Sequence, residues 1–175
     1  YNSKTKICMT RRTTQDDYIK FVYSTTIAGA GLSAVGRQGG EQPLYLSSSA
    51  TKGTVMHELM HAAGFYHEQC REDRDQFVRI NEANIKDDSK NNFQMEGGVA
   101  RSSYDYCSIM HYSSTAFSKN GQPTIECIQN GMVVACPPCL GNRAAFSDAD
   151  LHGISWFYSN ASRFPCESFA EPVYF

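Results

Sequence analysis

Three histidines near the middle of the chain have the spacing of a metal site. His57 and His61 are four residues apart, and His67 follows shortly after Gly64. Residues four apart on a helix lie on the same face, so the first two imidazoles can reach one ion. Gly64 lets the chain leave the helix with a positive φ, so that His67 can turn back toward that ion. Three nitrogen ligands leave a fourth position open, which is the arrangement of a catalytic zinc.

Glu58 would complete this chemistry. It follows His57 directly and can take a proton from a water whose pKa zinc lowers to about 7. The alternative is a set of helix histidines satisfied by ordinary hydrogen bonds. However, the full H-E-x-x-H-x-x-G-x-x-H pattern would arise by chance on the order of once in 10⁵ such chains. We therefore predict one zinc per chain, held by His57, His61 and His67, with Glu58 as general base in a hydrolysis by metal-activated water.

The composition is that of one folded domain. The chain has 175 residues, of which 41% are hydrophobic and 19% charged, so it can bury a core of its own. Its formal net charge is −2 without a long run of like charges, which argues against nucleic acid or a membrane surface as a partner. The longest apolar runs are too short to cross a bilayer.

Hydrophobic periodicity and turn residues predict an α+β domain. One helix is expected over 51–63, because Val55, Leu59 and Ala62 recur on one face, opposite the histidines. A capping-box-like start predicts a second helix over 148–158. Only short helical turns are expected over 71–101. Short strands are predicted at 7–10, 18–23 and 44–46.

The seven cysteines favour an oxidising compartment, where they would form disulfides. Cys136 and Cys139 also have C-x-x-C spacing, which leaves a second metal site as an alternative, although no further Cys or His pair follows at zinc-finger distance. The sequon at Asn160 is compatible with a secreted surface. We therefore predict a secreted, extracellular protein.

Further motifs surround the zinc pattern. Gly64-Phe65-Tyr66-His67-Glu68-Gln69 precedes Arg71 and Asp73-Arg74-Asp75, and Ser108-Ile109-Met110-His111-Tyr112 follows downstream. Together these segments resemble the zinc signature and Met-turn of the metzincins, specifically the astacin family. The resemblance implies a two-lobed catalytic domain with a twisted sheet, an active-site helix and a C-terminal helix around a zinc cleft. It also implies a secreted zinc endopeptidase. A catalytically silent binding module is the alternative, and the intact Glu58 argues against it.

The resemblance also implies roles for residues around the metal. Met110 would lie beneath the zinc. Tyr112 would be a fifth ligand that swings away to hydrogen-bond the tetrahedral intermediate, although both residues would otherwise be taken for core. A peptide would bind in extended form along an edge strand at 32–35, with Leu32, Ser33 and Ala34 as contact residues.

Arg143 lies in a Gly-x-Arg segment that, in similar relatives, approaches the pocket for the residue after the scissile bond. The guanidinium would favour an acidic side chain there. The alternative is a solvated arginine near Asp148 or Asp150. His111 and His152 have no partner at ligand spacing and are expected to be structural or exposed.

Residues 1–175 are expected to form one peptidase domain that lacks the N-terminal strand and helix usual in the family. Of the family's two usual disulfides, one corresponds to Cys8 and Cys166. The positions of the other are occupied here by Gly31 and Ser49. Since the metal motif and the Met-turn converge on one ion, Cys70 and Cys107 are the candidates for a compensating bridge.

Three cysteines then remain, Cys127, Cys136 and Cys139, and an odd thiol could pair with the N-terminal part of the family's domain or with another chain. The resemblance further places Glu68 near the buried N-terminus of mature family members. A solvated ion pair of Glu68 with Arg71 or Arg74 is the alternative.

Overall fold

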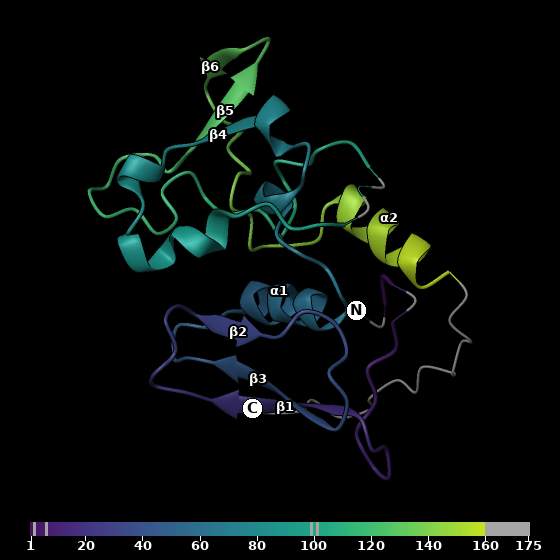
Figure 1. The fold of residues 1–175 in the computed structure, drawn as a ribbon. Helices are drawn as coiled ribbons and strands as arrows, with labels where there is room; N and C mark the ends of the chain where they lie inside the picture. The colour runs from purple at the N-terminus through teal and green to yellow at the C-terminus, as the bar shows by residue number, and fades with distance from the viewer. Residues whose placement is uncertain (2, 6, 99, 101, 160–175) are drawn as a thin grey trace.

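The computed structural model describes residues 1, 3–5, 7–98, 100 and 102–159, arranged in two lobes (Figure 1). The N-terminal lobe holds a three-stranded sheet and helix α1 (Lys52–Ala62), which lies between that sheet and the C-terminal lobe. The C-terminal lobe holds a second three-stranded sheet, short 3₁₀ helices and helix α2 (Asp148–Phe157). This mixture of helix and sheet is the predicted α+β architecture. None of the described helices is long and apolar enough to cross a membrane.

The first sheet has the order β1-β3-β2 and places a short strand at its edge. Strand β1 (Tyr18–Tyr23) runs parallel to β3 (Glu41–Leu46), and β2 (Gly31–Ser33) pairs with β3 in the antiparallel sense. The predicted strand at 18–23 and the edge strand near 32–35 are therefore found, although the latter ends at Ser33. Residues 7–10 form irregular chain instead of a strand, because a short run with two β-branched residues does not by itself determine pairing.

Helix α1 begins and ends with local signals in the sequence. The Thr51 hydroxyl accepts a hydrogen bond from the Thr54 amide at 3.2 Å, and the Thr54 hydroxyl accepts one from the Thr51 amide at 3.0 Å, which closes a capping box. At the other end Gly64 has φ +100° and donates its amide to the His61 carbonyl at 2.8 Å. Both features are local to the helix, so the helix at 51–63 was predictable from sequence.

The expected division of α1 into an apolar face and a ligand face is wrong. Leu59 is buried, but Val55 and Ala62 are only partly buried, whereas His57 and Glu58 on the ligand face are buried. The physical reason is that the helix is covered on both sides, by the sheet and by the C-terminal lobe (Figure 1). The ligands therefore lie inside the protein.

The second sheet has the order β4-β5-β6, with β4 (Val78–Ile80), β5 (Ile125–Gln129) and β6 (Met132–Val134), and was not predicted. Asn130 and Gly131 connect β5 to β6 with φ values of 52° and 76°. Two consecutive positive φ angles are typical of the type I′ hairpin turn, for which Asn-Gly is the strongest signal. This hairpin could therefore have been found from sequence. Three 3₁₀ helices agree with the short turns expected at 71–101: Arg74–Gln76, Glu82–Asn84 and Asp87–Phe93. A further one, Glu68–Cys70, precedes them.

Two disulfides lie in the C-terminal lobe, and neither joins the predicted pair. Cys107 is bonded to Cys139 and Cys127 to Cys136, while Cys70 is a free, buried thiol. The prediction of a Cys70–Cys107 bridge is therefore wrong. The segment after β6 passes close to Cys107 and brings Cys139 into bonding distance instead.

The same pairing excludes the C-x-x-C metal site, since Cys136 and Cys139 belong to different disulfides. It also leaves Cys70, rather than one of the three cysteines near β5 and β6, as the free thiol of the described chain. That thiol donates a hydrogen bond to the Asn92 carbonyl at 3.4 Å. The predicted partner of Cys8, Cys166, lies outside the described residues.

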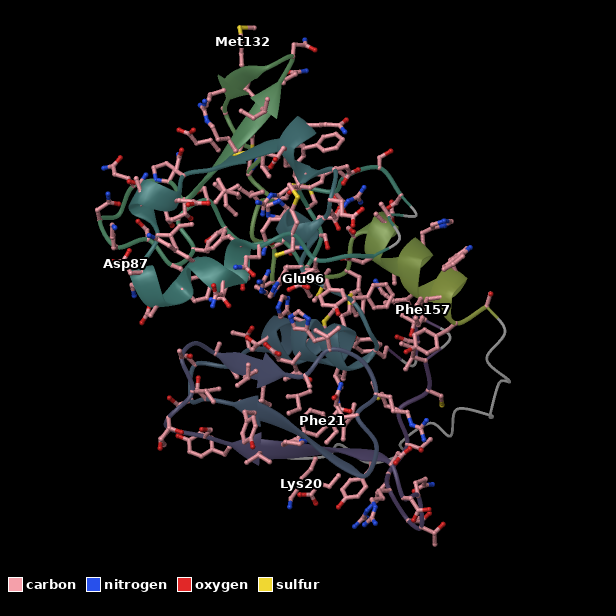
Figure 2. All side chains as sticks on the ribbon, in the orientation of Figure 1. Lys20, Phe21, Asp87, Glu96, Met132 and Phe157 are labelled. Atoms are coloured by element: carbon pink, nitrogen blue, oxygen red, sulfur yellow. A yellow bond between two sulfur atoms is a disulfide. The ribbon has the colours of Figure 1, made fainter. Side chains whose placement is uncertain are left out.

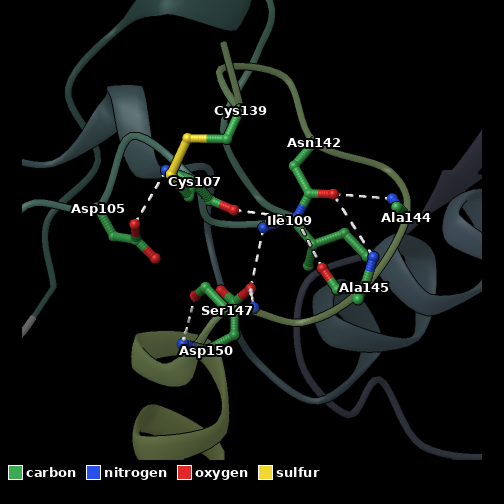
Figure 3. Close-up of a disulfide and its surroundings, with 9 residues drawn as sticks. All are labelled: Asp105, Cys107, Ile109, Cys139, Asn142, Ala144, Ala145, Ser147 and Asp150. Carbon is green, nitrogen blue, oxygen red and sulfur yellow. Dashed lines mark hydrogen bonds between the residues drawn. A yellow bond between two sulfur atoms is a disulfide. The ribbon is translucent and has the colours of Figure 1, made fainter. Parts of the chain in front are cut away.

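Asp150 joins α2 to the segment that contains the Met-turn motif (Figure 3). Its buried carboxylate accepts hydrogen bonds from the Ser108 hydroxyl at 2.6 Å and from the Ile109 amide at 2.9 Å. It also accepts the Ser147 amide at 2.9 Å, as the third residue of the helix should in a capping box. One carboxylate therefore caps a helix and fixes a distant loop.

We predict that Asp150→Asn lowers the free energy of unfolding by about 2 to 3 kcal/mol, because an amide would place a donor against the backbone N–H groups. Asp148→Asn is the matched control, since it removes the same charge from an exposed position in the first turn of α2 and should cost less than about 1 kcal/mol. Urea unfolding of both variants measures the difference. Equal losses of unfolding free energy in Asp150→Asn and Asp148→Asn would mean that the buried hydrogen bonds of Asp150 do not stabilise the fold.

Candidate metal centre

The Nε2 atoms of His57, His61 and His67 converge on one point between the lobes. The His67 Nε2 lies 3.1 Å from that of His61 and 3.3 Å from that of His57. Nitrogens bound at about 2.0 to 2.1 Å to a tetrahedral zinc would be about 3.4 Å apart, so this spacing fits the metal. Among the described His, Cys, Asp and Glu residues, these three form the one group close enough to share an ion.

Hydrogen bonds to two of the rings orient them as ligands. The His57 Nδ1–H donates to the Ile109 carbonyl and the His61 Nδ1–H to the Phe65 carbonyl, each at 2.8 Å. With the proton on Nδ1, the lone pair lies on Nε2 and points at the shared position. Such carbonyl partners are typical of metal-binding histidines.

Burial keeps the imidazoles neutral. It lowers the pKa of His57 to about 3 and that of His61 to about 4, and it lowers the pKa of His67 well below its usual value; the Arg143 charge acts in the same direction on all three. Unprotonated nitrogens this close repel one another through their lone pairs unless a cation lies between them. The three residues therefore fit one zinc ion.

Glu58 lies beside this group, against the backbone of β2. A Cβ at Gly31 would lie only 2.7 Å from the Glu58 Cγ and Oε1, so the side chain fits there because Gly31 has none. Burial raises the pKa of Glu58 to about 7, although the Arg143 charge and the Ser33 amide oppose the shift. A carboxylate of that basicity is suited to accept a proton from water near neutral pH.

The Met-turn motif brings Met110 and Tyr112 to the same region. Met110 is buried in a cluster with Met60, Ile109 and Ile154, and its carbonyl accepts the Glu68 amide at 3.2 Å. The centroid of the Tyr112 ring lies 4.4 Å from that of His67.

The backbone of Tyr112 is held on both sides. Its N–H donates to the side-chain oxygen of Gln69 at 3.0 Å, and its carbonyl accepts the His111 Nδ1–H at 2.7 Å. The sequence alone did not assign a role to Gln69, which is completely buried. Only its place directly after Glu68 in the metal motif could have drawn attention to it.

The remaining histidines are not ligands in the described structure, as the sequence predicts. His111 is buried, and its Nε2 accepts the Tyr104 hydroxyl at 2.7 Å. His152 is exposed on α2. One is therefore structural and the other lies on the surface.

Glu68 forms an ion pair with Arg71 at 2.9 Å, and the same oxygen accepts the Asp105 amide at 2.9 Å. The pair is more buried than expected, since the Glu68 side chain is 16% exposed. Burial raises the pKa of Glu68 to about 7. Arg74 instead donates to the Gln69 carbonyl at 3.0 Å. A cavity of about 610 Å³ lies beside Glu68.

Arg143 lies close to the metal centre and is half-buried. Its Nη1 donates to the His111 carbonyl at 3.0 Å, and its charge acts on Glu58 and Tyr112. Its own carbonyl packs against Gly53 in the first turn of α1, where any Cβ would collide with it. Its side chain is thus only partly solvated, although the Asp150 charge of the alternative also acts on it.

A buried H-E-x-x-H helix, a third histidine after a glycine turn and a Met-turn motif in the same region are the combined features of metzincin-type zinc peptidases. A family model described as Astacin, a peptidase family, matches residues 1–159. The chain therefore belongs to the astacin family, and the resemblance noted from the sequence is confirmed.

Individual relatives support the same family assignment. The chain is 41% identical over 165 residues to the zinc metalloproteinase nas-13 of Caenorhabditis elegans, covering 91% of this chain and 34% of that protein. It is 39% identical over 163 residues to high choriolytic enzyme 1 of Oryzias latipes, covering 91% of this chain and 57% of that protein. The solved structure of the latter, described as a hatching enzyme zinc-protease, superposes with a TM-score of 0.81 over 90% of this chain and 76% of that one. The chain thus spans less than two thirds of the length of these two curated relatives.

We predict about one zinc per chain, and a loss of zinc affinity of more than about a hundredfold in His67→Ala, because a direct ligand contributes more than its hydrogen-bond partners do. Elemental analysis after dialysis against a weak chelator measures the metal content. His152→Ala is the control and should keep its zinc. Retention of zinc by His67→Ala would remove His67 from the ligand set.

Proposed function

We propose that this chain is a secreted zinc-dependent endopeptidase that hydrolyses internal peptide bonds. The observation that carries the proposal is Glu58, a buried carboxylate directly beside three converging histidine nitrogens. A silent binding module would have no need for a base at this position. Two disulfides in the described chain support secretion, because such bonds persist in oxidising compartments.

Each residue of the site has a separate role in the proposed reaction. His57, His61 and His67 would hold a zinc ion, which when bound would supply a Lewis acid for the scissile carbonyl and for water. Glu58 removes a proton from the attacking water and then delivers it to the amine that leaves. Tyr112 donates its hydroxyl hydrogen to the oxygen that becomes negatively charged in the transition state.

The peptide would lie along β2, which is one of the two edge strands of the first sheet. An edge strand offers unpaired backbone N–H and C=O groups, to which an extended peptide can add as a further strand. Leu32 and Ala34 are exposed, and Ser33 lies between them with its amide toward Glu58. Binding through the backbone positions an internal bond of almost any sequence.

We predict that the protein cleaves denatured casein, that a chelator abolishes cleavage, and that Glu58→Gln lowers kcat/KM by at least about a hundredfold with zinc retained. The amide keeps the size of the side chain and removes its basicity. Zinc content and initial rates are the measurements. Wild-type protein that binds zinc without cleaving casein or a broad peptide library would support the binding module instead.

For Tyr112→Phe, we predict that zinc content is unchanged and that kcat falls more than KM rises, because the lost hydrogen bond forms mainly in the transition state. Steady-state kinetics on one peptide give both constants. An unchanged kcat would leave Tyr112 with a packing role against His67.

Arg143 gives the specificity that we propose for the residue after the scissile bond. A guanidinium can hold a carboxylate through two hydrogen bonds, which would favour Asp or Glu by about tenfold to a hundredfold in kcat/KM. Peptide-library profiling should reveal this preference in the wild type and its loss in Arg143→Ala. Arg79→Ala, which removes an exposed arginine from β4, is the control. An acidic preference that survives in Arg143→Ala would exclude this role.

A further inference from the structure

The segment that carries Arg143 has no regular structure of its own. It runs from the end of β6 at Val134 to the start of α2 at Asp148, and its residues are in turns, bends or irregular chain. Neither helix nor sheet hydrogen bonds therefore fix Arg143 opposite the metal centre. Its position must come from contacts with other parts of the protein.

One contact is covalent and leads to the Met-turn segment (Figure 3). Cys139 is bonded to Cys107, which lies just before the buried Ser108, Ile109 and Met110. The Asn142 side chain strengthens the same connection, because its Nδ2 donates to the Cys107 carbonyl at 3.0 Å. The disulfide and this hydrogen bond therefore tie the segment to one residue of the metal centre's supporting loop.

Asn142 also shapes the turn from which Arg143 extends. Its Oδ1 accepts the Ala144 amide at 2.8 Å, and its Nδ2 donates to the Ala145 carbonyl at 2.7 Å. Its backbone amide donates to the Cys139 carbonyl at 2.9 Å. One amide side chain thus fixes the backbone after Arg143 and connects it to the disulfide.

Close packing leaves the segment little freedom. A Cβ at Gly141 would lie 2.7 Å from the Ser113 Cβ, and the Arg143 carbonyl lies against Gly53. The guanidinium uses Nη1 for the carbonyls of His111 and Asn142, whereas its Nε and Nη2 have no hydrogen bond to any described residue. Those two groups remain available to a substrate carboxylate.

We propose that Asn142 and the Cys107–Cys139 disulfide are positioning residues for Arg143, and that they set the preference for an acidic residue after the scissile bond. This inference rests on the specificity proposed above for Arg143. A bidentate contact needs the guanidinium plane held in one orientation, and a segment without regular structure provides this only while it is anchored. Loss of the anchors should therefore affect selectivity more than turnover.

The test compares two peptides that differ only in Asp or Ala after the scissile bond, and the readout is the ratio of their kcat/KM values. Asn142→Ala and the double variant Cys107→Ser/Cys139→Ser should each lower this ratio at least about fivefold, while kcat/KM for the Ala peptide stays within about twofold. Neither change should lower the ratio further in the Arg143→Ala background, because the anchors act through Arg143.

The second disulfide provides a matched control. Cys127→Ser/Cys136→Ser removes the same chemistry from the other end of the segment, where Cys136 joins it to β5 of the hairpin, whose tip at Met132 lies at the end of the molecule away from α1 (Figure 2). This variant should keep the wild-type ratio. An equal fall in both double variants would overturn the inference, because it would show a general effect of losing a disulfide.

The remaining outcomes are also decisive. If Arg143→Ala lowers the ratio and Asn142→Ala does not, the inference fails and the specificity role of Arg143 stands. If Arg143→Ala keeps the wild-type ratio, the proposed specificity fails and the inference fails with it. Zinc content is measured for every variant, and where the Cys107→Ser/Cys139→Ser protein does not retain zinc, Asn142→Ala decides alone.

Discussion

Three imidazole nitrogens lie about as close together as the ligand geometry of zinc allows, and the surrounding structure depends on this convergence. Each nitrogen must be unprotonated and correctly aimed before a metal arrives. Burial satisfies the first condition by lowering the pKa values of His57 and His61. Backbone carbonyls of Ile109 and Phe65 satisfy the second by accepting the Nδ1 protons. The metal centre thus needs an interior position and two fixed loops.

Both requirements shape the fold around α1. A helix packed only against its own sheet would expose its ligands to water, so the C-terminal lobe covers the opposite face (Figure 1). The loop that supplies the Ile109 carbonyl is held in turn by the Asp150 carboxylate from α2. The orientation of one ligand therefore depends on a helix that carries none, which gives the C-terminal helix a part in metal binding.

The features predicted correctly are those with local causes. The position of α1, the positive φ of Gly64 and the start of α2 each depend on residues within a few turns. The errors concern contacts between distant segments. Cys107 could not be paired from sequence because its partner depends on the path of the chain after β6. The capping-box-like start of α2 includes Asp150, but the contact of Asp150 with Ile109 depends on the packing of two distant segments.

The distances along the chain between the ligands and their supports bear on how the metal centre is assembled. His57 and His67 are 10 residues apart, whereas His57 and its partner Ile109 are 52 apart. By loop-closure entropy, the longer connection costs about 1.5 kcal/mol more to form. The contacts among the histidines are thus local in sequence, whereas the hydrogen bond to the Ile109 carbonyl joins distant parts of the chain. In a folding chain, capture of the metal can precede docking of the lobes, and an early-bound ion would then serve as a template on which the Met-turn closes.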